Sequence, residues 1–313
     1  MAMSSVWGFS QEMITLYGIS LLGFILRKTG TLNEHTNDVL TQLILYGTLP
    51  ALILLSLDIS FSFTLVKELT LLITMSIFIL TISCFIAAWM RKHSKLPDQQ
   101  KSVYEGLIIF GNQGFIGYAV SYLLFGDKGI VIATMFNLCY FVLIWTYGIY
   151  LFTKNKDRIN WRNIFFNPGI VATLIGLIFM FSPLSWPEVV ANGLESVGKM
   201  TIPLSMILIG SLVANAHPKE FFTSLKNQYL WKSAFAKLLF IPLFLLPFAF
   251  FSVPFPLLAT AVIVSGMPSA STVSLYAQRY GADALFGSFG VLLTTLLCLV
   301  SIPILYWICT IIY

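Results

Sequence analysis

The chain has 313 residues, of which 58% are hydrophobic and only 10% are charged, and its mean hydropathy is +0.86. A soluble domain carries about a quarter charged residues, so this composition argues against a soluble protein and predicts an all-α polytopic protein of the cell membrane, embedded in the lipid bilayer. The net charge of +5 is spread over the loops, where it reports orientation in the membrane and gives no indication of nucleic-acid binding.

Ten apolar segments predict ten transmembrane helices. The first five cover residues 6–26, 39–57, 70–90, 102–125 and 130–152. The second five cover residues 164–181, 189–214, 229–251, 256–280 and 285–312. Basic residues gather after the odd-numbered segments, so the positive-inside rule predicts a cytoplasmic linker at 154–163 and both termini outside the cytoplasm. The N-terminal residues lack a basic cluster, and we expect no cleaved signal peptide.

The linker separates two halves of five segments each, residues 1–153 and 164–313. Gly266 and Gly281 in the second half follow Gly111 and Gly126 in the first half by 155 residues each. Each half has an odd number of segments, so its second copy must enter the membrane from the opposite side. The sequence therefore predicts an inverted-topology repeat, which many secondary transporters share.

Polar interruptions divide the fourth and ninth segments, GNQGFIG at 111–117 and SGMPSAS at 265–271. Each lies about 18 Å along its helix, close to the middle of a hydrocarbon core about 30 Å thick. Glycine and proline weaken a helix and free backbone polar groups, which persist at this depth only inside protein or beside a wet cavity. Two such interruptions in corresponding segments indicate the binding site of a transporter.

The interruptions favour an anion, because the N-terminal ends of the half-helices that follow them carry partial positive charge and free N–H groups. The predicted substrate-binding residues, supported by the hydroxyl of Thr272, are Gly111, Asn112, Gln113, Gly114, Ser265, Gly266, Pro268, Ser269 and Ser271. Close helix packing is the alternative explanation for the glycines, including Gly117. It accounts poorly for the Asn-Gln pair and for Pro268.

Three further polar residues lie within apolar segments, and each has two interpretations. Asn137 could contact the substrate or form an interhelical hydrogen bond. Lys237 could be a fixed positive charge that supports the transport core, or it could extend to the cytoplasmic surface. Lys199 could face the cavity and select for a second carboxylate, or it could reach the outer headgroups.

Motifs of enzymes and of metal sites are missing from the sequence. It contains no HExxH, GxSxG or Walker-type glycine loop, so we expect no catalytic residues, no metal and no other cofactor. No carboxylate lies at the predicted midplane, which argues against sodium coupling. The four cysteines lie in apolar runs, where we expect small buried side chains and no disulfides; they are Cys84, Cys139, Cys298 and Cys309.

Several motifs together resemble the auxin efflux carrier family of membrane transporters. They are FGNQGFIG at 110–117, NPGI at 167–170, GKMTIPL at 198–204, GSLV at 210–213, MPS at 267–269 and RYG at 279–281. The resemblance covers nearly the whole chain. The chain lacks the long central loop of many plant PIN carriers, so it is similar to the bacterial malate and malonate carriers of this family.

The resemblance implies a PIN-like fold of ten helices in two inverted repeats. Helices 1, 2, 6 and 7 would form a scaffold, and helices 3–5 and 8–10 a moving transport domain in which broken helices 4 and 9 cross at the substrate. Lys237 matches a structural lysine of the wider antiporter fold. PIN-like members carry proline in both interruptions, whereas the first one here has Gly114 and no proline, so the break point of helix 4 stays open.

From these observations we expect a secondary transporter of a small organic anion, a mono- or dicarboxylate such as malate or malonate. It would work by elevator-type alternating access, as a uniporter, an exchanger or a carrier of partly protonated acid, without sodium coupling. One alternative is an exporter of an auxin-like or amino-acid-derived acid. Another is an anion-sensing membrane receptor, against which the missing cytoplasmic domain counts. The scaffold helices could also pair two copies as a homodimer.

Overall fold

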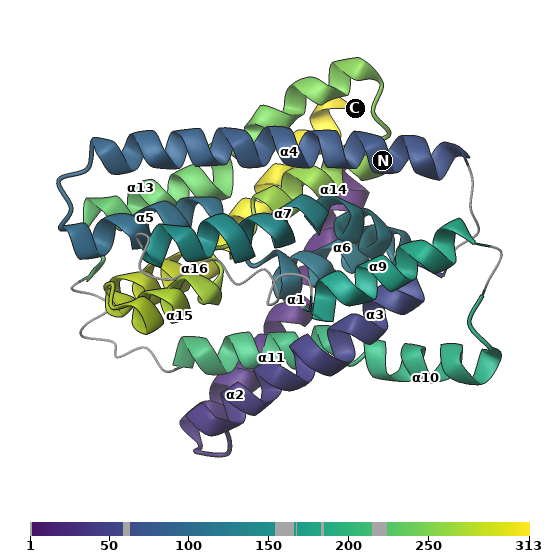
Figure 1. Ribbon diagram of the computed structural model, residues 1–313, viewed down its shortest axis with the longest axis horizontal. Coiled ribbons are helices and arrows are strands. Elements are labelled where there is room, and N and C mark those ends of the chain that lie inside the picture. The colour runs from purple at the N-terminus through teal and green to yellow at the C-terminus, as the bar shows by residue number, and fades with distance from the viewer. Residues whose placement is uncertain (1, 59–62, 154–165, 167, 183–184, 215–223) are drawn as a thin grey trace.

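The computed structural model describes all residues except 1, 59–62, 154–165, 167, 183–184 and 215–223 (Figure 1). All helices and turns of this described part form an all-α protein, and its only strand-like pairing is an isolated antiparallel bridge between Gly111 and Ser269. The predicted fold class is therefore confirmed as all-α and polytopic. The linker predicted at 154–163 lies outside the described residues.

The helices of the first half are α1 (Ala2–Lys28), α2 (Glu34–Leu43), the π-helical turn η1 (Ile44–Thr48), α3 (Leu49–Ser56), α4 (Phe63–Lys92), α5 (Asp98–Ile109), the π-helical turn η2 (Gln113–Gly117), α6 (Tyr118–Phe125) and α7 (Asp127–Thr153). Those of the second half are α9 (Pro168–Phe181), α10 (Glu188–Gly198), α11 (Thr201–Ala214), α13 (Gln228–Phe235), the π-helical turn η3 (Ala236–Phe240), the 3₁₀-helix η4 (Pro242–Phe251), α14 (Phe255–Ser265), α15 (Ser271–Tyr280) and α16 (Ala284–Ile312).

Five helical runs are long and apolar enough to cross a membrane by themselves. They are Glu34–Leu55, Val66–Lys92, Asp127–Thr153, Gln228–Phe251 and Ala284–Ile312. The fourth and ninth predicted segments instead consist of shorter helices in series, α5 with η2 and α6, and α14 with α15. The chain is thus a multi-pass membrane protein, and ten crossings remain the prediction for its complete topology.

Local sequence explains where several helices begin and end. Oδ1 of Asp283 accepts the N–H of Phe286 at 2.9 Å and caps the start of α16. α6 ends at Gly126 and α15 ends at Gly281, with φ of 60° and 75°, in the region that favours glycine. These two glycines are one of the pairs that the 155-residue offset superposes, so the two halves end their broken helices in the same way.

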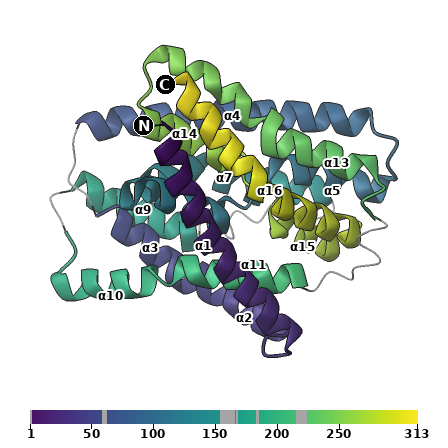
Figure 2. The same cartoon turned by 180° about the vertical axis from the view of Figure 1, so that it is seen from behind.

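The helices form two groups. α4 runs along one side of the molecule against α5, α7 and α14, and α13 and α16 belong to the same group (Figure 1). On the other side α1 packs against α11, and α3 packs against α9 and α10 (Figures 1 and 2). The groups meet where α1 contacts α16, α3 contacts α7 and η2 contacts α11.

Two helices form the centre of the first group. Every residue of α5 from Ser102 to Ile109 is buried, and so is every residue of α14 from Leu257 to Ser265. A helix buried on all sides belongs to the interior of a protein. α5 and α14 are the helices that lead into the two interruptions, so the fold places both interruptions deep inside it.

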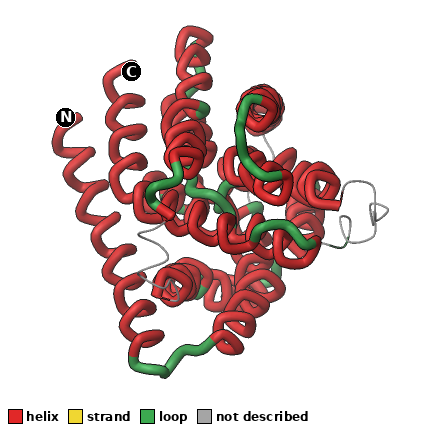
Figure 3. The backbone as a smooth tube through the Cα atoms, turned by 90° about the vertical axis from the view of Figure 1, so that its left-hand side faces the viewer, coloured by secondary structure: helices red, strands yellow, loops and turns green. Residues whose placement is uncertain are grey.

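The two ends of the chain lie near each other. α1 and α16 pack together, and their outer ends lie at the same side of the molecule in all three views (Figures 2 and 3). The predicted ten crossings would likewise return the chain to the side of the membrane on which it started.

Candidate functional site

The first break in a helix occupies residues 110–112. α5 ends at Ile109, and Asn112 is the N-cap of the helix that continues as η2 and α6. Oδ1 of Asn112 accepts the N–H of Phe115 at 3.3 Å, so a side chain satisfies one N–H group at the new helix start. Gly114 lies inside η2, and the chain therefore breaks before Gly114 and without a proline.

The second break occupies residues 266–270 and includes Pro268. α15 begins at Ser271, and its N-cap residue Ala270 has no side-chain oxygen to accept a helix N–H. Within the described part of the chain, no acceptor bonds the N–H groups of Ser271 and Thr272. This helix start keeps its unsatisfied donors and its partial positive charge.

The two breaks are joined by their backbones. The N–H of Asn112 donates to the carbonyl of Pro268 at 2.6 Å, and the N–H of Ala270 donates to the carbonyl of Phe110 at 2.9 Å. The predicted binding residues of the two halves, more than 150 residues apart in sequence, therefore meet in one place. In this arrangement the helix starts of η2 and α15 lie next to each other.

The hydroxyls of Ser265 and Ser269 both donate hydrogen bonds to carbonyl groups of the protein. Oγ of Ser269 donates to the carbonyl of Leu107 at 2.7 Å, and Oγ of Ser265 donates to the carbonyl of Val262 at 2.8 Å. The N–H of Ser269 donates to Oγ1 of Thr294 at 3.0 Å. In this conformation both hydroxyl protons form hydrogen bonds within the protein, and these bonds hold the second break in place. The predicted role of the two hydroxyls was to donate to an anion.

Lys237 lies against the first break. Its side chain is 2% exposed, and Nζ donates to the carbonyl of Ile109, the last residue of α5, at 3.1 Å. A cation at a helix C-terminus interacts favourably with the partial negative charge there. Among the described residues no carboxylate pairs with Lys237. The buried position is compatible with the interpretation that Lys237 supports the transport core.

The space available for an added Cβ shows which glycines of the two interruptions allow close packing of neighbouring atoms. A Cβ on Gly111 would lie 2.9 Å from Nζ of Lys237, and a Cβ on Gly266 would lie 2.5 Å from Cδ1 of Leu305. Both glycines are therefore needed for close packing. Gly114 has no atom within 4 Å of its added Cβ, so helix packing does not explain it.

Two buried amide side chains, those of Gln113 and Asn137, have polar atoms without a hydrogen-bond partner among the described residues. Oε1 of Gln113 has no partner in the described structure, and neither Oδ1 nor Nδ2 of Asn137 has one, although Asn137 lies near the hydroxyl of Tyr118. A buried amide without partners costs free energy, and such groups are often found where a ligand or water binds.

Asn112, Gly114, Ser271 and Thr272 are partly exposed, whereas Gly111, Gln113 and residues 261–270 are buried. They lie in or directly after the two breaks and include the start of α15, which retains free N–H groups. We call these four residues the open rim of the site. The open rim is the part of the two breaks that a ligand could reach in this conformation.

Lys199 does not belong to this cluster. Its side chain is 64% exposed, and Nζ forms an ion pair with Glu195 one turn earlier. It immediately follows α10 and lies outside the junction of the two breaks.

Tyr140 and Thr294 form hydrogen bonds with the two breaks. The sequence analysis did not predict a role for either residue. The hydroxyl of Tyr140 donates to the carbonyl of Gly111 at 2.6 Å, as Thr294 accepts from the second break. Tyr140 follows Asn137 by three residues on α7, and Thr294 follows Tyr140 by 154 residues. This separation is one residue short of the 155-residue offset of the glycine pairs, so the two residues occupy similar positions in the two halves.

The described residues contain no group of three or more His, Cys, Asp or Glu side chains placed to hold a metal ion. Cys298 and Cys309 are buried, Cys84 and Cys139 are partly buried, and all four are free thiols.

Comparison with known proteins identifies the family. A family profile described as membrane transport protein matches residues 9–160 and 155–306. An uncharacterized transporter of Methanothermobacter thermautotrophicus is 27% identical over 314 aligned positions, covering 95% of this chain and 97% of that protein. An uncharacterized transporter of Methanocaldococcus jannaschii is 25% identical over 198 residues, 61% of this chain and 64% of that protein. The family match spans most of the chain, so the chain belongs to the membrane transport proteins of the auxin efflux carrier family.

Proposed function

We propose that this protein is a secondary transporter of a small organic anion, a mono- or dicarboxylate of the size of malate or malonate. The observation that carries this proposal is the junction of the two breaks. Backbone hydrogen bonds between residues 110–112 and 268–270 hold two helix starts together inside the buried core of the protein.

The charge at this junction supports an anionic substrate. The N–H groups of Ser271 and Thr272 have no acceptor in the described structure, and they lie at the positive end of α15. Lys237 adds a buried amine without a carboxylate partner in the same region. A carboxylate at the open rim would satisfy the free donors and balance this positive charge.

The packing supports an elevator mechanism. α1, α3, α9, α10 and α11 form the group that contains the predicted scaffold, whereas both breaks belong to the other group. We propose that this second group carries the anion across the membrane as one body. η2 and its N-cap Asn112 together carry half of the open rim, and η2 contacts α11 of the scaffold group, so the substrate would lie at the boundary between the groups.

Thermal unfolding of the purified protein against a panel of carboxylic acids tests the substrate class. A ligand that binds the folded protein raises its apparent stability. The acid with the largest shift is then tested for uptake into liposomes that contain only this protein, with sodium or with potassium outside. We expect equal uptake in both salts. Binding of the acid without any uptake would favour a receptor, and uptake only with sodium would contradict the proposed coupling.

We also propose that residues 154–163 face the cytoplasm and that both termini lie outside, because basic residues alternate between loops. Single cysteines at Asn155 and Ser4 can be labelled with an impermeant thiol reagent on intact cells, in a background without the native cysteines. We expect labelling of Ser4→Cys alone. Labelling of Asn155→Cys alone would reverse the orientation.

A further inference from the structure

Two adjoining cavities lie along the contact between α4 and α7, away from the junction of the breaks. One has a volume of about 510 Å³ and is lined mainly by apolar side chains of both helices, among them Ile77, Phe85 and Leu143. The other has a volume of about 240 Å³, and polar side chains including Arg91 line it. Tyr147 borders both cavities, and we call the two adjoining cavities together the α4/α7 groove.

The apolar part of the groove faces outward. Phe85 is 74% exposed and Ile77 is 53% exposed, and in a membrane-spanning helix such side chains meet lipid. Along α4 this part extends from Ile77 to Ala88, a rise of about 17 Å. That length is about half of a hydrocarbon core of about 30 Å. The apolar part therefore matches the depth of one leaflet.

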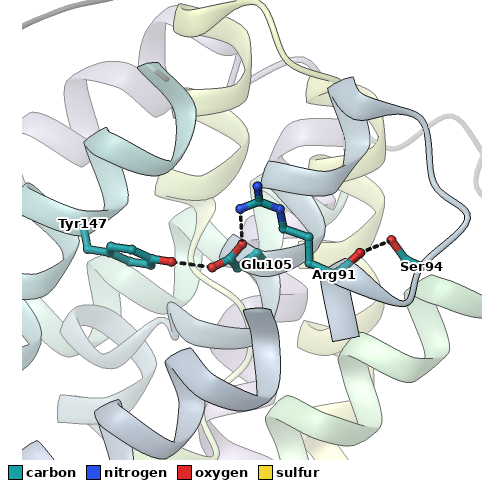
Figure 4. A network of polar contacts seen from close by, with 4 residues as sticks. All are labelled: Arg91, Ser94, Glu105 and Tyr147. Atoms are coloured by element: carbon teal, nitrogen blue, oxygen red, sulfur yellow. Dashed lines mark hydrogen bonds and ion pairs between the residues drawn. The ribbon is translucent and has the colours of Figure 1, made fainter. Parts of the chain in front are cut away.

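The polar part of the groove carries two cations. Arg91 uses Nη1 to pair with Oε2 of Glu105 at 2.6 Å, while the hydroxyl of Tyr147 donates to Oε1 of the same carboxylate at 2.5 Å (Figure 4). The side chain of Arg91 remains 41% exposed. A guanidinium has five N–H donors, so the ion pair leaves donors for a second partner. Glu105 thus fixes Arg91 at the groove without using up its hydrogen bonds.

Lys101 is the second cation. Its Nζ pairs with Oδ1 of Asp98 at 3.0 Å, and the two side chains are 35% and 79% exposed. An exposed ion pair contributes little and can be replaced by a stronger partner. The loop and helix start at residues 91–101 contain four basic residues and one acidic residue. Arg91 and Lys101 line the polar part of the groove together with Asp98, and the exposed Lys92 and Lys95 lie in the adjacent loop and helix end.

We propose that the α4/α7 groove binds an anionic phospholipid, with its phosphate at Arg91 and Lys101 and one acyl chain along the apolar part. The basic loops predict that this end faces the cytoplasm, whose leaflet holds anionic lipids, and basic pockets between transmembrane helices on that side suit their headgroups. A free anion would occupy only the polar part and would leave the apolar part without a role. The lipid would contact α4, α5 and α7 together and connect them at one edge.

Native mass spectrometry of the purified full chain in detergent tests this proposal. The probes are phosphatidylglycerol, phosphatidylcholine and glycerol 3-phosphate, which carries the phosphate without acyl chains. We expect the protein to retain phosphatidylglycerol in preference to phosphatidylcholine, and glycerol 3-phosphate to leave the bound lipid in place. Equal retention of the two lipids, or displacement of phosphatidylglycerol by equimolar glycerol 3-phosphate, would overturn the proposal.

Two variants locate the lipid. Lys101→Gln should lower the affinity for phosphatidylglycerol by about fivefold and leave phosphatidylcholine unaffected. Lys128→Gln is the matched control, because Lys128 is an exposed lysine at the opposite end of α7. Ala88→Trp fills the apolar part and should reduce the retention of both lipids. Arg91 is left intact, since its loss would strand the buried carboxylate of Glu105. Unchanged lipid affinity in both Lys101→Gln and Ala88→Trp would place the lipid elsewhere and contradict the assignment.

Discussion

The two breaks stabilise their freed backbone groups in different ways. At the first break side chains do so: Lys237 bonds the carbonyl of Ile109, Tyr140 bonds the carbonyl of Gly111, and Asn112 caps the next helix. At the second break the backbone of the first break supplies two of the hydrogen bonds. Thr294 supplies a third, through the N–H of the residue before the N-cap.

This difference identifies the more open of the two helix starts. The start of η2 already has a side-chain cap from Asn112, whereas the start of α15 has Ala270 at the N-cap and two N–H groups without acceptors in the described structure. We propose that the first break, with its buried amine, supports the site and that the start of α15 binds the carboxylate. The following predictions test this division.

The largest effect is expected for Lys237→Gln. Loss of the amine leaves the carbonyl of Ile109 without its partner and removes a positive charge from the core. We expect transport to fall to the level of empty liposomes while the protein still inserts and purifies as a folded protein. Lys232→Gln, which changes an exposed lysine one turn and a half earlier, should transport normally. Full transport by Lys237→Gln would show that the first break needs no cation.

Ala270→Asp should have the next largest effect, because it places a carboxylate at the N-cap of α15. The new side chain would accept the free N–H groups and repel an anionic substrate. We expect the affinity for the best carboxylic acid to fall by at least about a hundredfold, with no loss of thermal stability in the absence of ligand. Ala270→Asn adds a cap of similar shape without the charge and should weaken binding less. Equal affinity in Ala270→Asp and the unaltered protein would place the anion away from α15.

Gly111→Ala should destabilise the protein, because its Cβ would lie 2.9 Å from Nζ of Lys237 and 3.3 Å from the carbonyl oxygen of Met267. Overpacking of this kind costs about 1–3 kcal/mol, which a lower unfolding temperature would report. Gly114→Ala, in the same interruption but with no neighbour within 4 Å, is the control and should unfold at the original temperature or above. The opposite ranking of the two variants would contradict the packing described for the first break.

The smallest effect is expected for Ser271→Ala. Ser271 belongs to the open rim. Loss of one hydrogen bond from its hydroxyl to a charged ligand weakens binding by about tenfold. Ser288→Ala removes a hydroxyl from the first turns of α16, where it bonds the carbonyl of Ala284, and should leave affinity unchanged. Isothermal titration with the best acid measures both, and identical affinities would remove Ser271 from the site.

The residue types of the two interruptions were enough to predict where the helices of the candidate site break. The interruptions at 111–117 and 265–271 were identified from glycine, proline and polar residues at midplane depth, and the structure places the helix breaks in or beside them. The role of Ser269 was not predictable, because its hydroxyl donates to Leu107 in a segment 162 residues away. Tyr140 was missed for the same reason: tyrosines are common in apolar segments, and only the bond to Gly111 distinguishes this one.

Composition, motifs and spacing are enough to predict the class of protein, the family and the places along the chain where the fourth and ninth segments are interrupted. Only the tertiary structure decided that Lys237 lies buried on the first break, that Lys199 stays at the surface, and that α15 keeps the open helix start. The physical reason is that lipid tails are as apolar as a protein interior. In such segments the pattern of apolar residues no longer marks which face of a helix meets its neighbours, and tertiary packing alone selects it.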